Sequence, residues 1–436
     1  MQETIERGDV EHARRLARTL RLRVRVYRSD AFSALSSAAL LILLSGCRPA
    51  ARNELSPTLT ARKSPRELAV TLQPPDPNGT RRTFDEIVAL PDEKFDVAEA
   101  ILALASEIPV EAGGTATPDI AATLTELDRL ADRAKTDLPD NPDGIDIFDT
   151  LYEVVLDRKA ADPYRDDRAD NYDLPLAARK HRGSCLSVGI MTLSVARRMG
   201  VPVYGVQCPA HFFLKYLARP GGKDAKDAAT LNFDVTRPTP DNWKKLDDDF
   251  YRKWQRIDTQ AEMSGAYLRP LSDREVVSTY LASRSGFFSG KKLYAKALAD
   301  AERALALNPR NVTACVNAGF ANEAAGDYEE AARHYNRALQ IDPESVRAMN
   351  NLAYLKVRDQ SSSIYDLKGA EKLIQTALRE QPGSAFLHAT NGEVAAARRD
   401  WRAAGRSMQD ALRIEPKNAV YRERFMFFRD KLRAEK

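Results

Sequence analysis

The chain lacks most of the sequence features that mark a nucleic-acid, nucleotide or metal site. Residues 1–46 hold eight of the 66 Lys and Arg and five of the 62 Asp and Glu, so the rest of the chain is nearly neutral. Nucleic-acid binding usually requires a clustered basic surface, so we expect no nucleic-acid partner. The sequence has no phosphate-cradling glycine loop, dinucleotide fingerprint or metal-ligand spacing. We therefore expect neither a cofactor nor a metal.

Long apolar runs are also scarce. Residues 31–44 form the only one, and its 14 residues are fewer than the roughly 20 that a membrane-spanning helix needs. This run follows an arginine-rich stretch and ends in Leu-Ser-Gly-Cys at residues 44–47. A basic region, an apolar core and small residues at its end are typical of an export signal. A buried helix with an incidental cysteine is the alternative.

The Leu-Ser-Gly-Cys ending resembles the bacterial lipobox, in which the cysteine is lipidated and becomes the new N-terminus. The resemblance implies that Cys47 carries a lipid anchor, which holds a protein on a membrane without spanning it. Arg48 follows the cysteine where an Asp would favour the inner membrane. This implies a bacterial cell-envelope protein of the outer membrane or periplasm. The three remaining cysteines are an odd number, which does not suggest a disulfide framework.

The sequence predicts a tether and a mixed helix-and-strand domain after the signal segment, residues 1–46. Residues 47–82 are rich in Pro, Arg, Ser and Thr and have no sustained apolar period, as expected of a tether. Residues 83–270 combine helical apolar spacing with three strand-like runs. These runs are Val201–Gln207, His211–Tyr216 and Thr230–Thr236.

Residues 271–436 contain an internal repeat. Each unit has an Ala-Leu pair followed by a proline, and the prolines are 34, 39 and 34 residues apart; a polar insertion around residues 361–363 accounts for the longer interval. A period of 34 is typical of the tetratricopeptide repeat, a pair of helices. We predict about four repeats and a solvating end helix, with a concave face that binds a protein or peptide partner. The alanines expected between paired helices are Ala297, Ala331, Ala370 and Ala404, and Cys315 is expected in the core of the second repeat.

A candidate nucleophilic site lies in the mixed domain. Cys185 follows Gly-Ser and starts a helical segment that should end at Gly200. Free backbone N–H groups in the first turn favour a thiolate there. His211 is the candidate ion-pair partner or general base, and Asp234 is the candidate acid that orients the imidazole.

Strand pairing predicts how these residues meet. A hairpin centred near residues 222–223 would place His211 directly opposite Asp234, with Cβ atoms about 4.5–5.5 Å apart. Alternation then puts both on a polar face of the sheet together with Asn232 and Thr236. Gln207 and Asn232 are possible oxyanion or support residues, although Gln207 also fits an ordinary polar strand end. We expect Cys208 to be a packed thiol, with a disulfide to Cys185 as the alternative.

Three segments around these residues resemble the bacterial transglutaminase-like domains, notably the SirB-type branch that is often fused to tetratricopeptide repeats. They are Gly183–Ser187 (GSCLS), Ala196–Val206 (ARRMGVPVYGV) and Pro209–Tyr216 (PAHFFLKY). The resemblance covers roughly residues 90–245 and implies an α+β papain-like fold, with helices packed on an antiparallel sheet. It also implies that Cys185 is the nucleophile, His211 the base and Asp234 the orienting acid.

Together these features predict a membrane-anchored cysteine hydrolase or acyltransferase that acts on an amide or peptide. Its repeats would recruit a protein partner. Proteolysis, amide hydrolysis and transamidation all begin with the same thioester, so the residues leave them open. The alternative is a non-catalytic envelope scaffold that binds proteins through both folded parts.

Overall fold

The computed structural model describes residues 82–105, 107, 119–155, 174, 183–217, 230–236 and 246–435. The predicted signal segment, the tether up to residue 81 and the lipidation site Cys47 lie outside these residues. None of the described helices is both long and apolar enough to span a bilayer.

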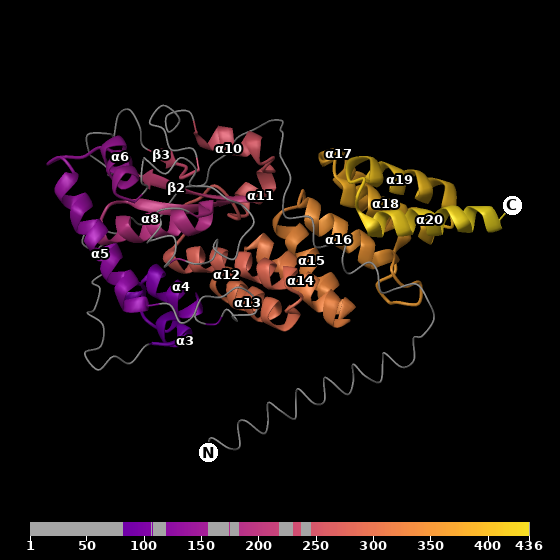
Figure 1. Ribbon diagram of the computed structural model, residues 1–436, viewed down its shortest axis with the longest axis horizontal. Helices are drawn as coiled ribbons and strands as arrows, with labels where there is room; N and C mark the ends of the chain where they lie inside the picture. The colour runs from indigo at the N-terminus through magenta and orange to yellow at the C-terminus, as the bar shows by residue number, and fades with distance from the viewer. Residues whose placement is uncertain are drawn as a thin grey trace, which may run out of the picture. The chain divides into compact units, whose positions relative to one another are not determined.

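The first part of the described chain is a small antiparallel sheet with helices packed on it, the α+β class that the sequence predicts (Figure 1). Its elements, in chain order, are α3 (Phe84–Val88), the 3-10 helix η2 (Asp92–Lys94), α4 (Val97–Ala105), α5 (Ile120–Asp137), α6 (Gly144–Val155), α8 (Cys185–Met199), β1 (Val203–Cys208), β2 (His211–Leu217), β3 (Thr230–Phe233), α10 (Asp248–Trp254) and α11 (Thr259–Met263).

The strand order is β1-β2-β3, and both pairs are antiparallel. The predicted register between β2 and β3 is wrong by two residues, because Leu214 pairs with Phe233 and His211 therefore does not lie directly opposite Asp234. The predicted third strand is also too long. The Asp234 side chain accepts the Thr236 N–H at 2.9 Å, a local turn that ends the strand at Phe233. An even shift leaves every side chain on its predicted face.

Helix α8 begins at Cys185 because of a capping box. Ser184 is the N-cap, its hydroxyl accepts the Ser187 N–H, and the Ser187 hydroxyl accepts the Ser184 N–H in return. The helix ends at Gly200, whose φ of 71° lies in the left-handed region that glycine adopts without strain. Both ends agree with the sequence prediction.

The ring of Phe212 sets how closely α8 approaches the sheet. The position that a Cβ would take on Gly189 of α8 is 2.8 Å from this ring, and the same position on Gly205 of β1 is 2.7 Å from it. Phe212 is 2% exposed and follows His211 directly on β2. Only a residue without a side chain fits at either glycine, so the helix that carries Cys185 lies close against the strand that carries His211.

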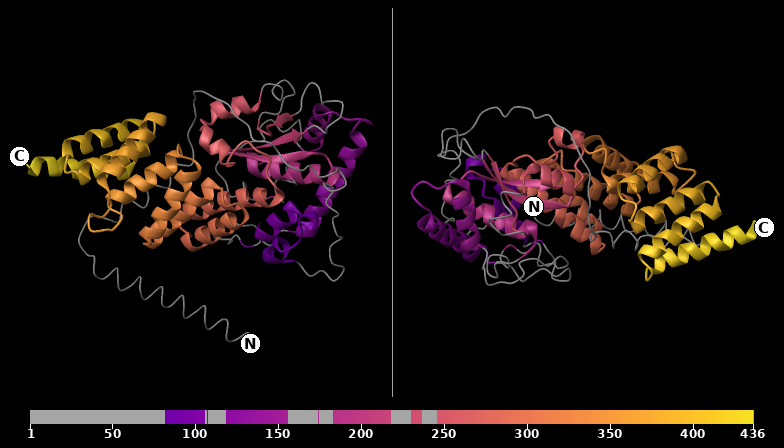
Figure 2. Two further views of the ribbon diagram at one scale, coloured as in Figure 1. Left: turned by 180° about the vertical axis from the view of Figure 1, so that it is seen from behind. Right: turned by 90° about the horizontal axis from the view of Figure 1, so that it is seen from above.

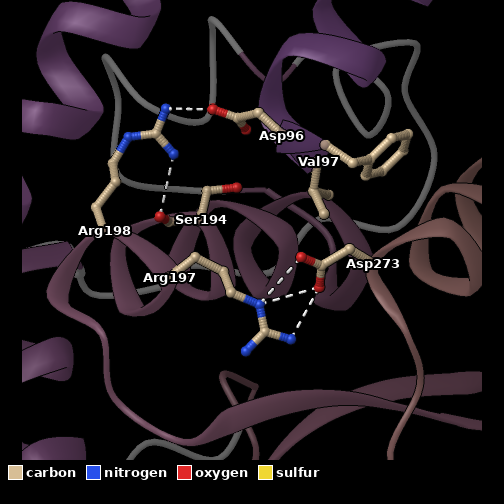
Figure 3. Close-up of a pocket in the computed structure, with 7 residues that line it drawn as sticks. Asp96, Val97, Ser194, Arg197, Arg198 and Asp273 are labelled. Carbon is tan, nitrogen blue, oxygen red and sulfur yellow. Dashed lines mark hydrogen bonds and ion pairs between the residues drawn. The ribbon is translucent and has the colours of Figure 1, made fainter. Parts of the chain in front are cut away.

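The last turn of α8 is fixed by two buried arginines (Figure 3). Arg197 donates to both carboxylate oxygens of Asp273, at 2.8–3.2 Å, and Arg198 donates to Asp96 at 2.8 Å. Each guanidinium already has a carboxylate partner, so the small pocket between these residues needs no ligand to balance its charge. We interpret it as a structural contact.

The C-terminal part is a series of paired helices that follow one another along the chain (Figures 1 and 2). They are α12 (Asp273–Gly290), α13 (Tyr294–Leu307), α14 (Val312–Ala325), α15 (Tyr328–Ile341), α16 (Val346–Val357), α17 (Leu367–Glu380), α18 (Ala385–Ala397), α19 (Trp401–Ile414) and α20 (Ala419–Ala434). The four alanines predicted between paired helices are all 0% exposed, and so is Cys315. The predicted repeat array is confirmed, with α20 as the end helix.

Helix α12 joins the two parts. Its Val276 lies 2.9 Å from the Cβ position of Gly205 on β1. Its Arg284, fully buried, donates to Asp300 of α13 at 2.6 and 2.7 Å. A second junction forms where the Tyr267 hydroxyl donates to Asp342, after α15, at 3.0 Å. The repeat array is therefore packed against the domain that carries Cys185.

Replacing Gly189 with Ala tests the contact between α8 and Phe212. The added methyl group forces the helix or the ring to move, so we expect the free energy of unfolding to fall by about 1–2 kcal/mol. Gly405→Ala in α19 is the matched control, because no atom lies within 4 Å of its Cβ position. Alanine's better helix propensity predicts a gain of up to about 1 kcal/mol there. Urea unfolding followed by circular dichroism measures the stability of both variants. Equal changes in the two variants would contradict a close contact between Gly189 and Phe212.

Candidate active site

Cys185 is the first residue of α8, and its side chain is partly buried. The first backbone N–H that bonds back within the helix is that of Val188, which donates to the Ser184 carbonyl at 3.0 Å. The earlier N–H groups of Cys185 and Leu186 belong to the first turn, where N–H groups have no partner within the helix. The thiol therefore lies where N–H dipoles favour a negative charge.

His211 is the first residue of β2, and its side chain is only 6% exposed. Its Nε2 lies 2.8 Å from Oδ2 of Asp234. The Cys185 side chain lies close enough to the ring to raise the pKa of His211. Because Nε2 faces Asp234, we infer that Nδ1 is the nitrogen that faces the thiol. The structure thus brings the three predicted residues together in the order Cys185, His211, Asp234.

Asp234 is completely buried, and both of its carboxylate oxygens accept hydrogen bonds. Oδ2 faces His211 Nε2 and accepts the Tyr251 hydroxyl at 3.1 Å. Oδ1 accepts the Thr236 N–H at 2.9 Å and the Thr236 hydroxyl at 2.6 Å. Burial by itself raises the pKa of Asp234, but the hydrogen bonds and the charge of His211 lower it below its ordinary value. A fully buried carboxylate thus stays ionised.

The same contacts determine the charge of His211. Burial disfavours the imidazolium, but the hydrogen bonds and negative charges of Asp234 and Cys185 raise the pKa of His211 from 6.5 to about 10. At neutral pH the ring is therefore protonated and pairs with a carboxylate on one side. On the other side it faces the Cys185 side chain.

Aromatic rings surround the imidazole. Tyr251 lies parallel to it with ring centroids 6.1 Å apart, and Trp254 meets it edge-on at 5.2 Å. Phe213 stacks on Tyr251 at 3.9 Å. Tyr251 and Trp254 are not among the site residues predicted from the sequence. The available signal was their spacing of three residues, which places both on one face of a short helix after a capping Asp247.

Each of the two predicted support residues has a hydrogen-bond partner elsewhere in the fold. The side-chain oxygen of Gln207 accepts a hydrogen bond from the Thr279 hydroxyl on α12 at 3.0 Å. Asn232 donates to the Leu246 carbonyl and to Asp248, so it ties β3 to the start of α10. The predicted oxyanion role of either residue stays a prediction.

Cys208 on β1 is paired with His211 in the strand register. It is a free thiol, 1% exposed, and burial raises its pKa well above the ordinary value. It is thus a packed thiol in this structure, and the disulfide with Cys185 is not formed. Within the described residues, no group of three or more His, Cys, Asp or Glu side chains is arranged to hold a metal ion.

Two protein-family models match segments of the chain. Residues 121–282 match the model of the transglutaminase-like superfamily, and residues 323–359 match a TPR repeat model. The chain contains a transglutaminase-like domain and tetratricopeptide repeats. The matched region of the transglutaminase-like domain includes Cys185, His211 and Asp234. No curated protein matches the chain.

Similar solved structures are tetratricopeptide repeat proteins and assemblies. A tetratricopeptide repeat protein from Parabacteroides merdae is 16% identical over 37% of this chain and 66% of its own, with a TM-score of 0.31. YrrB, a TPR protein with an unusual peptide-binding site, is 16% identical over 35% of this chain and 77% of its own, with a TM-score of 0.28. The APC/C hetero-tetramer Cut9-Hcn1 is 10% identical over 80% of this chain and 54% of its own, with a TM-score of 0.33. Likeness at this level supports no functional argument.

The raised pKa of His211 can be tested by NMR titration of the imidazole in the transglutaminase-like domain. We expect a pKa near 10 in the native protein. In Asp234→Asn the amide carries no charge, so the contribution of the carboxylate is lost and the pKa of His211 should fall clearly below its native value. An unchanged pKa in this variant would show that Asp234 does not hold the proton on His211.

The same shift predicts how stability depends on pH. The folded protein binds the His211 proton more tightly than the unfolded chain, whose pKa is about 6.5. The stabilisation from this proton is therefore complete below about pH 6.5 and is lost as the pH rises through about 10.

Proposed function

We propose that the transglutaminase-like domain is a cysteine-dependent hydrolase or acyltransferase that acts on amide bonds. The observation that carries the proposal is the chain of contacts from the Cys185 thiol through His211 to the buried Asp234 carboxylate. A thiol at a helix start, an imidazolium and a buried carboxylate in series make a nucleophile whose charged form is stabilised before a substrate arrives.

In the proposed first step, the thiolate of Cys185 attacks the carbonyl carbon of the amide and forms a C–S bond. The electron pair of the carbonyl moves to its oxygen, which the first-turn N–H groups of Cys185 and Leu186 would stabilise. When the tetrahedral intermediate collapses, the C–N bond breaks and the amine nitrogen takes the proton from Nδ1 of His211. The products are a thioester on Cys185, a free amine and a neutral imidazole.

In the second step, neutral His211 accepts a proton from the nucleophile that attacks the thioester. Water gives a carboxylic acid, and a second amine gives a new amide; either one releases the Cys185 thiolate and restores the imidazolium. Asp234 remains ionised throughout and stabilises the charged ring. Hydrolysis and transamidation share every protein group in this scheme and differ only in the acceptor.

The repeats and the N-terminus would supply location and recruitment. Tetratricopeptide repeats generally mediate protein–protein contacts, and we propose that the concave face of this array recruits a protein or peptide partner. A lipid on Cys47 would hold the protein at the cell envelope, with the outer membrane or periplasm favoured by Arg48.

Cysteine-directed labelling tests the activated thiol. We expect iodoacetamide to modify Cys185 at pH 7 far faster than Cys208 and Cys315, which are 1% and 0% exposed. His211→Ala should slow the labelling of Cys185 about tenfold or more, because an ordinary thiol is mostly protonated at this pH. His388→Ala, in the repeats, should leave the rate unchanged. Equal rates in both variants, measured by peptide mass spectrometry, would mean that His211 does not activate the thiol.

Complementation of a deletion strain distinguishes turnover from scaffolding. If the domain is an enzyme, Cys185→Ser should fail to restore function while being expressed at the native level. Cys315→Ser, which replaces a buried thiol of the repeats, is the control and should complement. Full complementation by Cys185→Ser would favour the non-catalytic envelope scaffold.

A further inference from the structure

We propose that Tyr251 is a positioning residue for His211, whose hydroxyl group fixes the Asp234 carboxylate and shares one of its oxygens with the imidazole. This inference rests on the proposed function of Cys185, because it assigns a role within the same site. It concerns a residue of α10, which lies outside the three predicted catalytic residues.

The geometry at Asp234 carries the proposal. Oδ2 lies 2.8 Å from His211 Nε2 and accepts the Tyr251 hydroxyl at 3.1 Å, so one oxygen serves both groups. Thr236 engages only Oδ1. Of these partners, Tyr251 is thus the one whose hydrogen bond competes directly with the imidazole for negative charge.

Helix α10 holds the Tyr251 hydroxyl in place. Asp248, its first residue, accepts Lys215 Nζ of β2 at 2.7 Å and Asn232 Nδ2 of β3 at 2.9 Å. Lys215 and Asn232 are 4% and 5% exposed, so both donors of this contact are buried, while the Asp248 carboxylate is partly exposed. Asp247 caps the same turn by accepting the Phe250 N–H. The start of α10 is thereby tied to the two strands that lead to His211 and Asp234.

The rings limit movement further. The Tyr251 ring is 0% exposed and stacks on Phe213 with centroids 3.9 Å apart and planes 5° from parallel. Trp254, one helical turn later, lies edge-on to His211. Both ring contacts limit the movement of the Tyr251 side chain.

The direction in which the second donor on Oδ2 changes the pKa of His211 can be predicted. Each donor draws negative charge from Oδ2, so the Tyr251 hydroxyl weakens the pull of Asp234 on the His211 proton. Titratable and charged groups around this site are Cys185 from α8, Cys208 from β1, Lys215 from β2, Asp234 after β3, and Asp248 and Tyr251 from α10. Of these, Tyr251 can lose its polar group while its ring stays in place.

The test is the Tyr251→Phe variant of the full chain, with the imidazole of His211 titrated by NMR. We expect its pKa to rise by about 0.5, the scale of a 10–30% change in a charge-assisted hydrogen bond. We also expect two imidazole orientations, or a broadened resonance, because the carboxylate has lost one of the bonds that fix it. A pKa that stays the same or falls overturns the proposal.

Tyr335→Phe is the matched control. Tyr335 is also fully buried, and its hydroxyl donates to Glu323 at 2.9 Å within the repeats. Both variants should lose similar stability, but only Tyr251→Phe should change the titration of His211. A similar change in both variants would show a general loss of stability and would count against the proposal. The titration needs no substrate, so an unreactive Cys185 would refute the proposed function while still leaving the role of Tyr251 measurable.

Discussion

The candidate site depends on how closely one helix packs on the sheet. Phe212 lies between two glycines, Gly189 of α8 and Gly205 of β1, with no space for a side chain at either position. His211 precedes Phe212 on the strand, and Cys185 lies about one helical turn before Gly189. The position of the Phe212 ring therefore determines how close the Cys185 thiol comes to the His211 imidazole. A larger residue at either glycine would separate them without touching a catalytic group.

The buried carboxylate imposes the second constraint. A completely buried charge is costly unless its acceptor sites are filled, and the bonds to Asp234 come from three different segments: His211 of β2, Thr236 after β3 and Tyr251 of α10. The need to satisfy one carboxylate therefore brings β2, the end of β3 and α10 together. The ionised Asp234 in turn keeps the His211 imidazole protonated. The burial and the charge of Asp234 therefore both stabilise its contact with His211.

Much of this could be predicted from the sequence because it depends on local rules. Ser184 and Gly200 are strong start and stop residues, and both ends of α8 were predicted correctly. The register between β2 and β3 was not predicted correctly, because the sequence does not determine the geometry of the connection between these strands. The shift is an even number of residues, so the side chains along the paired segments keep their predicted faces. Tyr251 was missed because its role depends on tertiary contacts of Asp248 that no local pattern encodes.

Helix α12 relates the site to the repeats. Val276 on one side of α12 packs toward β1, while Ser278 and Ser285 donate to backbone carbonyls of α13 at 2.7 and 2.6 Å. The buried Arg284 pairs with Asp300 on the same helix, α13. One helix thus serves as the first helix of the array and as a cover of the sheet. Arg284 also donates to the Leu104 carbonyl of α4 and to Glu107, so separating α12 from the first part would leave a buried charge with fewer partners.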